Sequence, residues 1–168
     1  KRILSTIARR AFRRPVTEAD LEAPMRRFHA GAKQGGFDSG IEMGLRNILL
    51  SPKFLFRLEG EPSNVGPNSP YRLSDIDLAA RLSFFIWSSM PDDELLQVAA
   101  EGRLRAPGVL DRQVQRMLAD PKAERLTTNF AGQWLNLRGV RRVSPDPDEY
   151  PEFDENLREA FLTETRLY

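Results

Sequence analysis

The 168-residue sequence contains no cysteine and a single histidine, His29. Without cysteine, these residues hold no thiolate nucleophile, thiolate metal ligand, disulfide or covalent c-type haem attachment. One histidine also excludes a histidine-rich metal site, and a Ser-His-Asp triad would have to use His29 as its base. No Gly-x-Ser-x-Gly motif supplies a serine for such a triad. We therefore interpret His29 as a structural or surface residue.

Long apolar runs are also missing. No apolar stretch approaches the roughly 20 residues that span a bilayer, and the richest one, residues 82–87, has the length of a core helix segment. We therefore expect no transmembrane segment. The first residues show neither an initiator methionine nor a signal-peptide pattern, and both ends fall inside helical pattern. We expect the chain to be a piece of a larger protein.

The net charge is only +1, but its sign is unevenly distributed. Residues 1–60 hold 12 Lys and Arg against 6 Asp and Glu, a net charge of +6. Residues 61–168 hold 13 against 18, a net charge of −5, so we expect the two parts to attract each other. Nucleic-acid-binding domains are more often basic overall and interleave basic residues with aromatic ones that stack on bases. Nucleic acid is therefore not an expected partner.

Hydrophobic periodicity predicts helices along the chain and no strand. Apolar residues recur at helical spacing over residues 3–14, and Pro15 ends that helix. Thr17 and Asp20 form a capping pair that begins the next helix, and Gly35 with Gly36 breaks it.

The resulting prediction is an all-α fold, an irregular bundle of about seven to eight helices. Residues 1–58 form a small basic helical unit, and residues 59–70 form a linker rich in Pro, Gly and Asn. Residues 71–168 form a larger helical domain that we expect to be truncated at its C-terminus.

Several long motifs resemble two planctomycete-type domains of unknown function. ARRAFRRPVT at residues 8–17 and ILLSPKFLFR at 48–57 resemble the domain numbered fifteen-ninety-five. ARLSFFIWSSMPDDELL at 80–96 and NFAGQWL at 129–135, together with LSD at 73–75, resemble its usual neighbour, fifteen-ninety-two. The resemblance implies a periplasmic or otherwise exported parent of several domains, often with a cytochrome c-like domain. It implies no catalytic residues, and we expect no cofactor within these residues and any haem c elsewhere in the parent.

Four arginines on the first helix, Arg9, Arg10, Arg13 and Arg14, are a candidate interaction surface. Guanidinium groups bind phosphate, sulfate and carboxylate, so an acidic protein or glycan surface would fit them. A charged helix face is more often solvated and paired with acids of its own chain, and we favour that interpretation. The acids we expect to pair with them are Asp146, Asp148, Glu149, Glu152, Asp154 and Glu155.

Asn129, Gln133 and Trp134 are a candidate ligand face, because a tryptophan beside amide side chains can hold a sugar ring. The aromatic residues here also fit core packing at helical spacing, a pattern shared by Phe84, Phe85, Trp87, Phe130 and Trp134. A buried tryptophan then needs one hydrogen-bond acceptor for its indole N–H. Since aromatic residues at helical spacing usually pack inside, we favour the core interpretation.

Two acidic clusters have structural explanations. Asp92, Asp93 and Glu94 follow Pro91 at a predicted helix start, where each carboxylate is stabilised by about 0.3–1 kcal/mol. Consecutive helix residues point in different directions, which is poor geometry for a shared metal ion. Residues 146–155 lack the spacing of a calcium-binding loop, and their prolines predict a plain extended loop.

Three functions follow as hypotheses. The leading one is a non-catalytic helical interaction or scaffold module that organises flanking domains of an exported, haem-linked bacterial protein. An alternative is part of a redox or hydrolytic enzyme whose cofactor lies in a flanking domain, with Asp92, Asp93 or Glu149 in acid–base roles. A third is a carbohydrate-binding module built on Trp134.

Overall fold

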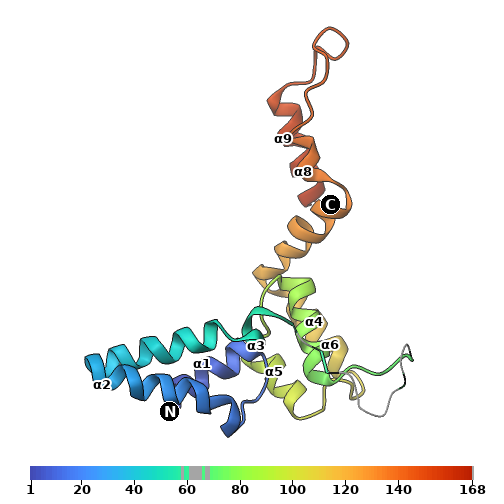
Figure 1. Ribbon diagram of the computed structural model, residues 1–168. Helices are drawn as coiled ribbons and strands as arrows, with labels where there is room; N and C mark the ends of the chain where they lie inside the picture. Colours follow the sequence, from blue (N-terminus) through green and yellow to red (C-terminus); the bar gives the residue numbers. More distant parts are fainter. Residues whose placement is uncertain (58, 61–65, 67–68, 168) are drawn as a thin grey trace.

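The structure, a computed structural model, describes residues 1–57, 59–60, 66 and 69–167 (Figure 1). Within these ranges there are nine α-helices, one 3₁₀-helix, one π-helix and no strand, so the predicted all-α class is confirmed. The count exceeds the predicted seven to eight because three of the α-helices are single turns. Of the predicted linker, residues 59, 60, 66, 69 and 70 have no regular structure, and the others lie outside the described residues.

The N-terminal unit consists of α1 (Arg2–Phe12), α2 (Glu18–Leu49) and α3 (Pro52–Leu55). Thr17 caps α2 through a reciprocal capping box with Asp20, as predicted. α2 has two antiparallel arms (Figure 1) that reverse at Gly35 and Gly36, where the break was predicted. Gly36 has φ 78° and ψ −164°, a conformation that only glycine adopts without strain.

A small apolar core holds α1 against both arms of α2. α1 can approach closely because Gly44 has no side chain: a Cβ there would lie 2.7 Å from Leu4 Cδ1. The buried members of this core are Leu4, Ala8, Ala11, Phe12, Leu21 and Ile48.

The central unit consists of α4 (Asp75–Trp87), α5 (Asp93–Ala100) and α6 (Val109–Ala119). Ser74 and Asp92 cap α4 and α5 with their side chains. Trp87 is fully buried, and its Nε1 donates a hydrogen bond of 2.8 Å to the carbonyl oxygen of Met117. The buried apolar residues of this second core are Ala79, Ile86, Trp87, Leu95, Ala99, Leu104 and Met117. The two cores have no residue in common.

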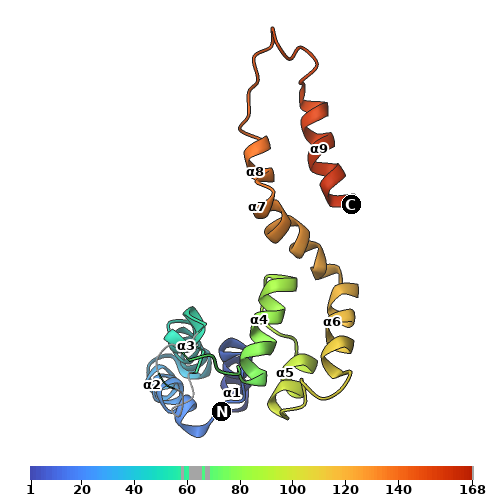
Figure 2. The same cartoon turned by 90° about the vertical axis from the view of Figure 1, so that its right-hand side faces the viewer.

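The rest of the chain is an arm that projects from the central unit (Figures 1 and 2). It begins with η1 (Pro121–Ala123) and the π-helix η2 (Leu126–Ala131), which contacts α4. α7 (Gly132–Trp134) and α8 (Leu137–Val140) follow, and a loop then leads to α9 (Glu155–Leu167), which packs back on α8 and η2. The loop between α8 and α9 is the far end of the arm (Figure 2). In the described ranges, none of these helices is long and apolar enough to cross a membrane.

Candidate interaction surfaces

The arginine row of α1 is mostly engaged within the molecule. Arg9 forms an ion pair with Asp93 of α5, and Arg14 donates hydrogen bonds of 2.8 Å to both carboxylate oxygens of Asp20. Arg10 is exposed and forms no ion pair with any residue that the structure describes. The acids that pair with this row are therefore Asp93 and Asp20. The predicted partners in the segment 146–155 were wrong, because that loop lies at the opposite end of the molecule (Figure 2).

Arg13 is a buried structural cation rather than a surface one. It is 8% exposed, in a left-handed conformation with φ 57° at the end of α1. Its Nη1 donates to the carbonyls of Ala11 and Phe54, at 3.1 and 3.2 Å, and its Nη2 donates to those of Lys53 and Phe56, each at 2.8 Å. Three of these bonds satisfy carbonyl groups in α3 and at the residue that follows it, and the fourth satisfies one in the last turn of α1. Arg13 thereby fixes α3 to the end of α1.

Asp20 is the matching buried anion of the N-terminal unit. Only 4% of its side chain is exposed, and it accepts hydrogen bonds from Arg14, from Lys53 Nζ at 2.6 Å and from the backbone N–H of Thr17 at 2.9 Å. The bonds from Arg14 lower its pKa most, those from Lys53 and Thr17 add to the effect, and burial opposes it. The pKa of Asp20 lies far below the ordinary aspartate value.

An apolar groove of about 550 Å³ lies between α3 and the C-terminal end of α4. Two guanidinium groups flank it: Arg57 lies 4.6 Å and Arg13 5.9 Å from the centroid of the Phe84 ring. Burial lowers the pKa of Arg13, and the nearby positive charge of Arg57 lowers it further. Neither arginine forms an ion pair with a carboxylate among the described residues. The residues lining this cationic groove are Ala11, Arg13, Phe54, Leu55, Phe56, Arg57, Phe84 and Met90.

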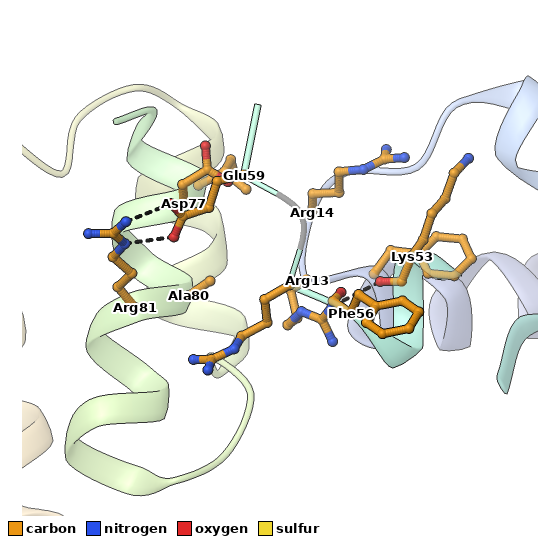
Figure 3. Close-up of a pocket in the computed structure, with 11 residues that line it drawn as sticks. Arg13, Arg14, Lys53, Phe56, Glu59, Asp77, Ala80 and Arg81 are labelled. Carbon is orange, nitrogen blue, oxygen red and sulfur yellow. Dashed lines mark hydrogen bonds and ion pairs between the residues drawn. The ribbon is translucent and has the colours of Figure 1, made fainter. Parts of the chain in front are cut away.

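A second hollow, of about 250 Å³, adjoins the cationic groove (Figure 3). α4 contributes Arg81 and Asp77 from one side, and the N-terminal unit contributes Arg14 and Lys53 from the other. Glu59 closes it by accepting two hydrogen bonds of 2.6 Å from Arg81. The two hollows are neighbours that share the lining residues Arg13, Phe56 and Arg57.

A row of exposed aromatic rings runs from α4 onto the arm. Phe85 and Phe130 meet edge to face with ring centroids 5.2 Å apart, and Phe130 stacks on Trp134 with centroids 6.1 Å apart. These side chains are 52%, 49% and 75% exposed, respectively. Asn129 anchors the π-helix to the end of α4 by donating a hydrogen bond of 2.8 Å to Ser88 Oγ. We call Phe85, Phe130 and Trp134 the aromatic surface.

Comparison with protein families assigns nearly the whole chain. Residues 73–168 match the family model PSD4, described as a protein of unknown function (DUF1592). The chain belongs to the DUF1592 family. Residues 1–59 match the model PSD5, also described as a protein of unknown function (DUF1595). The two domain resemblances seen in the motifs are therefore confirmed. No curated protein and no solved structure matches the chain.

The family boundaries place the cationic groove between the two domains. α3 lies within the DUF1595 match and α4 within the DUF1592 match. Ligand and partner sites are often found where domains meet. One feature of the sequence points to this site, the block Phe54, Leu55 and Phe56. Three consecutive large apolar side chains point in different directions, so they cannot all face one small core.

The core interpretation was correct for Trp87, which is fully buried. It was wrong for Phe85, Phe130 and Trp134, whose side chains are 52%, 49% and 75% exposed. Residues 126–131 form a π-helix, in which hydrogen bonds span five residues instead of four. The wider turn changes which residues share a face, so α-helical spacing does not predict the inward side here. Of the candidate ligand face, Trp134 and Gln133 are exposed, while the Asn129 amide is bonded to Ser88.

The acids at residues 92–94 form a helix start, as predicted. Asp92 accepts a hydrogen bond of 2.9 Å from the backbone N–H of Leu95 and one of 2.5 Å from Arg116. Burial raises the pKa of Asp92, but the bonds from Arg116 and Leu95 outweigh it, and the net pKa lies below the ordinary value. In the described part of the chain, no three His, Asp or Glu residues are grouped to hold a metal ion. His29 is exposed on α2, as predicted, with its ring against Phe28.

Proposed function

We propose that this chain is a non-catalytic helical interaction module that holds a neighbouring domain or partner protein against its aromatic surface. The observation that carries the proposal is the exposed row Phe85, Phe130 and Trp134. Exposed apolar residues are normally scattered singly, whereas a contiguous patch marks an interaction site. Large aromatic side chains are also the residues that contribute most to binding in protein interfaces.

The exposed area of the three rings is sufficient to matter energetically. Aromatic side chains bury about 150–250 Å² each, so covering the exposed fractions removes on the order of 300–400 Å² from water. At about 25 cal/mol per Å², this supplies roughly 8–10 kcal/mol. Association itself costs about 4–15 kcal/mol. The aromatic surface therefore favours a partner that is tethered in the same protein or that also contacts other parts of the molecule.

We further propose that this module is part of a larger, exported bacterial protein, and that any haem c of that protein is bound in a flanking domain. The resemblance of the motifs to exported, cytochrome-linked proteins supports that setting. Two carboxylates that an enzyme would use for acid–base chemistry already have structural partners. Asp92 caps α5 and pairs with Arg116, and Asp93 pairs with Arg9. These contacts support a non-catalytic role.

A site-specific cross-link tests the proposal in the protein as its host produces it. A photoreactive amino acid replaces Trp134 in one variant and Phe37 in a control variant, because Phe37 is 59% exposed at the distant turn of α2. Mass spectrometry then identifies the cross-linked peptides. We expect one recurring peptide from position 134 and none from position 37. Scattered products, or the same products from both positions, would show that the aromatic surface has no specific partner.

Carbohydrate binding is a second candidate, favoured by the 75% exposure of Trp134 and the stacked Phe130 beside it. An exposed indole can stack on a sugar ring, and Gln133 is exposed next to it. Trp87 is fully buried, so a sugar that binds changes the emission of Trp134 alone. Titration with soluble oligosaccharides and a glycan array would show binding that Trp134→Ala abolishes. A silent array and unchanged emission would remove this candidate.

A further inference from the structure

The far end of the arm carries an acidic turn whose chemistry complements the cationic groove. The loop between α8 and α9 is folded back at its tip: the carbonyl of Asp146 accepts a hydrogen bond of 2.8 Å from the N–H of Tyr150, and its carboxylate accepts one of 2.9 Å from Asp148. Tyr150 is 59% exposed at this turn. The tip therefore presents an aromatic ring among carboxylates. Its acidic residues are Asp146, Asp148, Glu149 and Glu152.

The base of this loop is held in place. Arg158 of α9 donates hydrogen bonds to the carbonyls of Val140 and Val143, the second at 2.9 Å. Asp154 caps α9 by accepting a hydrogen bond of 2.7 Å from the N–H of Leu157. A loop that is fixed at its base and folded at its tip loses less conformational freedom when it binds.

The cationic groove offers the opposite set of groups. Its apolar walls come from α3 and from Phe84 and Met90, and its volume of about 550 Å³ lies in the usual range for binding pockets. Arg57 is exposed and stacks on Phe84, while Arg13 is fixed behind it by four carbonyl groups. Two guanidinium groups that repel each other beside an apolar pocket favour an anion attached to an apolar group.

We propose that the cationic groove of one copy binds the acidic tip of a second copy, with Tyr150 in the groove and the carboxylates of Asp148 and Glu149 toward Arg57. Within one copy the tip is at the far end of the arm, away from α3 and α4, whose residues line the groove (Figures 1 and 2), so the contact forms between copies. This contact agrees with the uneven charge of the chain, because the groove lies mainly in the basic part, residues 1–60, and the tip lies in the acidic part, residues 61–168. This inference rests on the proposed interaction role but uses a different surface and names the partner.

The contact is heterologous, because groove and tip are different surfaces, and it therefore builds chains or rings of copies. The groove of a copy can still bind when its tip is altered, and its tip can still bind when its groove is altered. A variant that has lost its groove can still offer its tip, and a variant that has lost its tip can still offer its groove. Two variants that fail to associate alone must then form a pair when mixed, because one supplies an intact tip and the other an intact groove.

Sedimentation velocity on the chain and two charge-reversal variants, Arg57→Glu and Glu149→Lys, tests this. The wild-type chain should associate at concentrations on the order of 100 μM in about 0.05 M salt. Its association constant should fall about tenfold or more in about 0.5 M salt, because exposed charges are screened. Each variant alone should be monomeric, and an equimolar mixture should restore a dimer. Circular dichroism confirms that both variants keep the helical content of the wild-type chain.

A peptide probe keeps the test decisive if a variant fails to fold. A fluorescent peptide of residues 145–153 should bind the wild-type chain, and Tyr150→Ser in the peptide should weaken binding about tenfold or more. A monomeric wild-type chain, or a variant mixture that stays monomeric, would overturn the proposal. Cross-links from position 134 that persist in such a monomer would leave the proposed function standing, so the two failures are distinguishable.

Discussion

Replacing Asp20 by asparagine should destabilise the N-terminal unit, and the size of the loss should depend on pH. The carboxylate of Asp20 is 4% exposed and accepts hydrogen bonds from Arg14, Lys53 and Thr17. Asparagine keeps the shape and one acceptor but removes the negative charge. Arg14 and Lys53 would then face each other across a neutral amide.

The structure bounds the magnitude of this effect. Breaking a fully buried ion pair costs about 3–5 kcal/mol, but the side chains of Arg14 and Lys53 are 35% and 48% exposed, so water can replace part of the lost interaction. The capping box with Thr17 is also weakened, and a helix cap contributes about 0.5–2 kcal/mol. We expect Asp20→Asn to lose about 2–3 kcal/mol of unfolding free energy at pH 7. For a chain of this size that lowers the melting temperature by roughly 4–12 °C.

The pH dependence follows from the lowered pKa of Asp20. An unfolded aspartate titrates near pH 3.9, whereas the folded carboxylate stays ionised well below that. Its stabilising contribution is therefore complete above about pH 5 and is lost as the pH falls below about 4 toward the folded pKa. In wild type, stability falls through this acid range; in Asp20→Asn this part of the fall is absent. The difference between the two proteins should shrink as the solution becomes more acidic.

Urea unfolding followed by far-UV circular dichroism, repeated from about pH 7 to about pH 3, measures this difference. Glu42→Gln is the matched control, because Glu42 and Arg46 form an ion pair with side chains 60% and 72% exposed. That substitution should cost less than about 1 kcal/mol. A constant difference between wild type and Asp20→Asn across the acid range would refute the role assigned to Asp20. A loss of unfolding free energy at pH 7 no larger than that of Glu42→Gln would also refute it.

Three further substitutions test the packing. Gly36→Ala should lower the unfolding free energy by about 1–3 kcal/mol, because alanine is strained at the φ of 78° and ψ of −164° that Gly36 adopts. Chemical unfolding measures this loss, and an unchanged unfolding free energy would contradict the strain. Trp87→Phe should lower the unfolding free energy by about 1–3 kcal/mol in addition to the effect of the smaller side chain, because the buried Met117 carbonyl loses its hydrogen-bond donor. An unchanged infrared stretching frequency of the Met117 carbonyl would argue against this. Arg116→Ala should raise the pKa of Asp92 by removing its strongest hydrogen-bond donor, which carboxyl NMR titration checks and an unchanged pKa would refute.

Local sequence signals determined much of the fold. The capping pair at Thr17 and Asp20, the helix start at residues 92–94, and the reversal at Gly35 and Gly36 all lie where they were predicted. Each depends on groups only a few residues apart, so a short stretch of sequence contains all the physics involved. The all-α class follows from similar local information, because apolar residues at helical spacing place one apolar face on each helix, whatever element that face packs against.

Tertiary structure alone decided where the candidate interaction surfaces lie. Arg13 looks like its neighbours in the sequence, but three of its four carbonyl partners are those of Lys53, Phe54 and Phe56, some forty residues away. Trp134 has the spacing of a core residue, but the π-helix before it turns its ring toward solvent. The acidic loop was expected to meet the arginine row, and the arm holds the two apart (Figure 2). Periodicity and charge indicate what a side chain can contact; only the packing of distant segments determines what lies beside it.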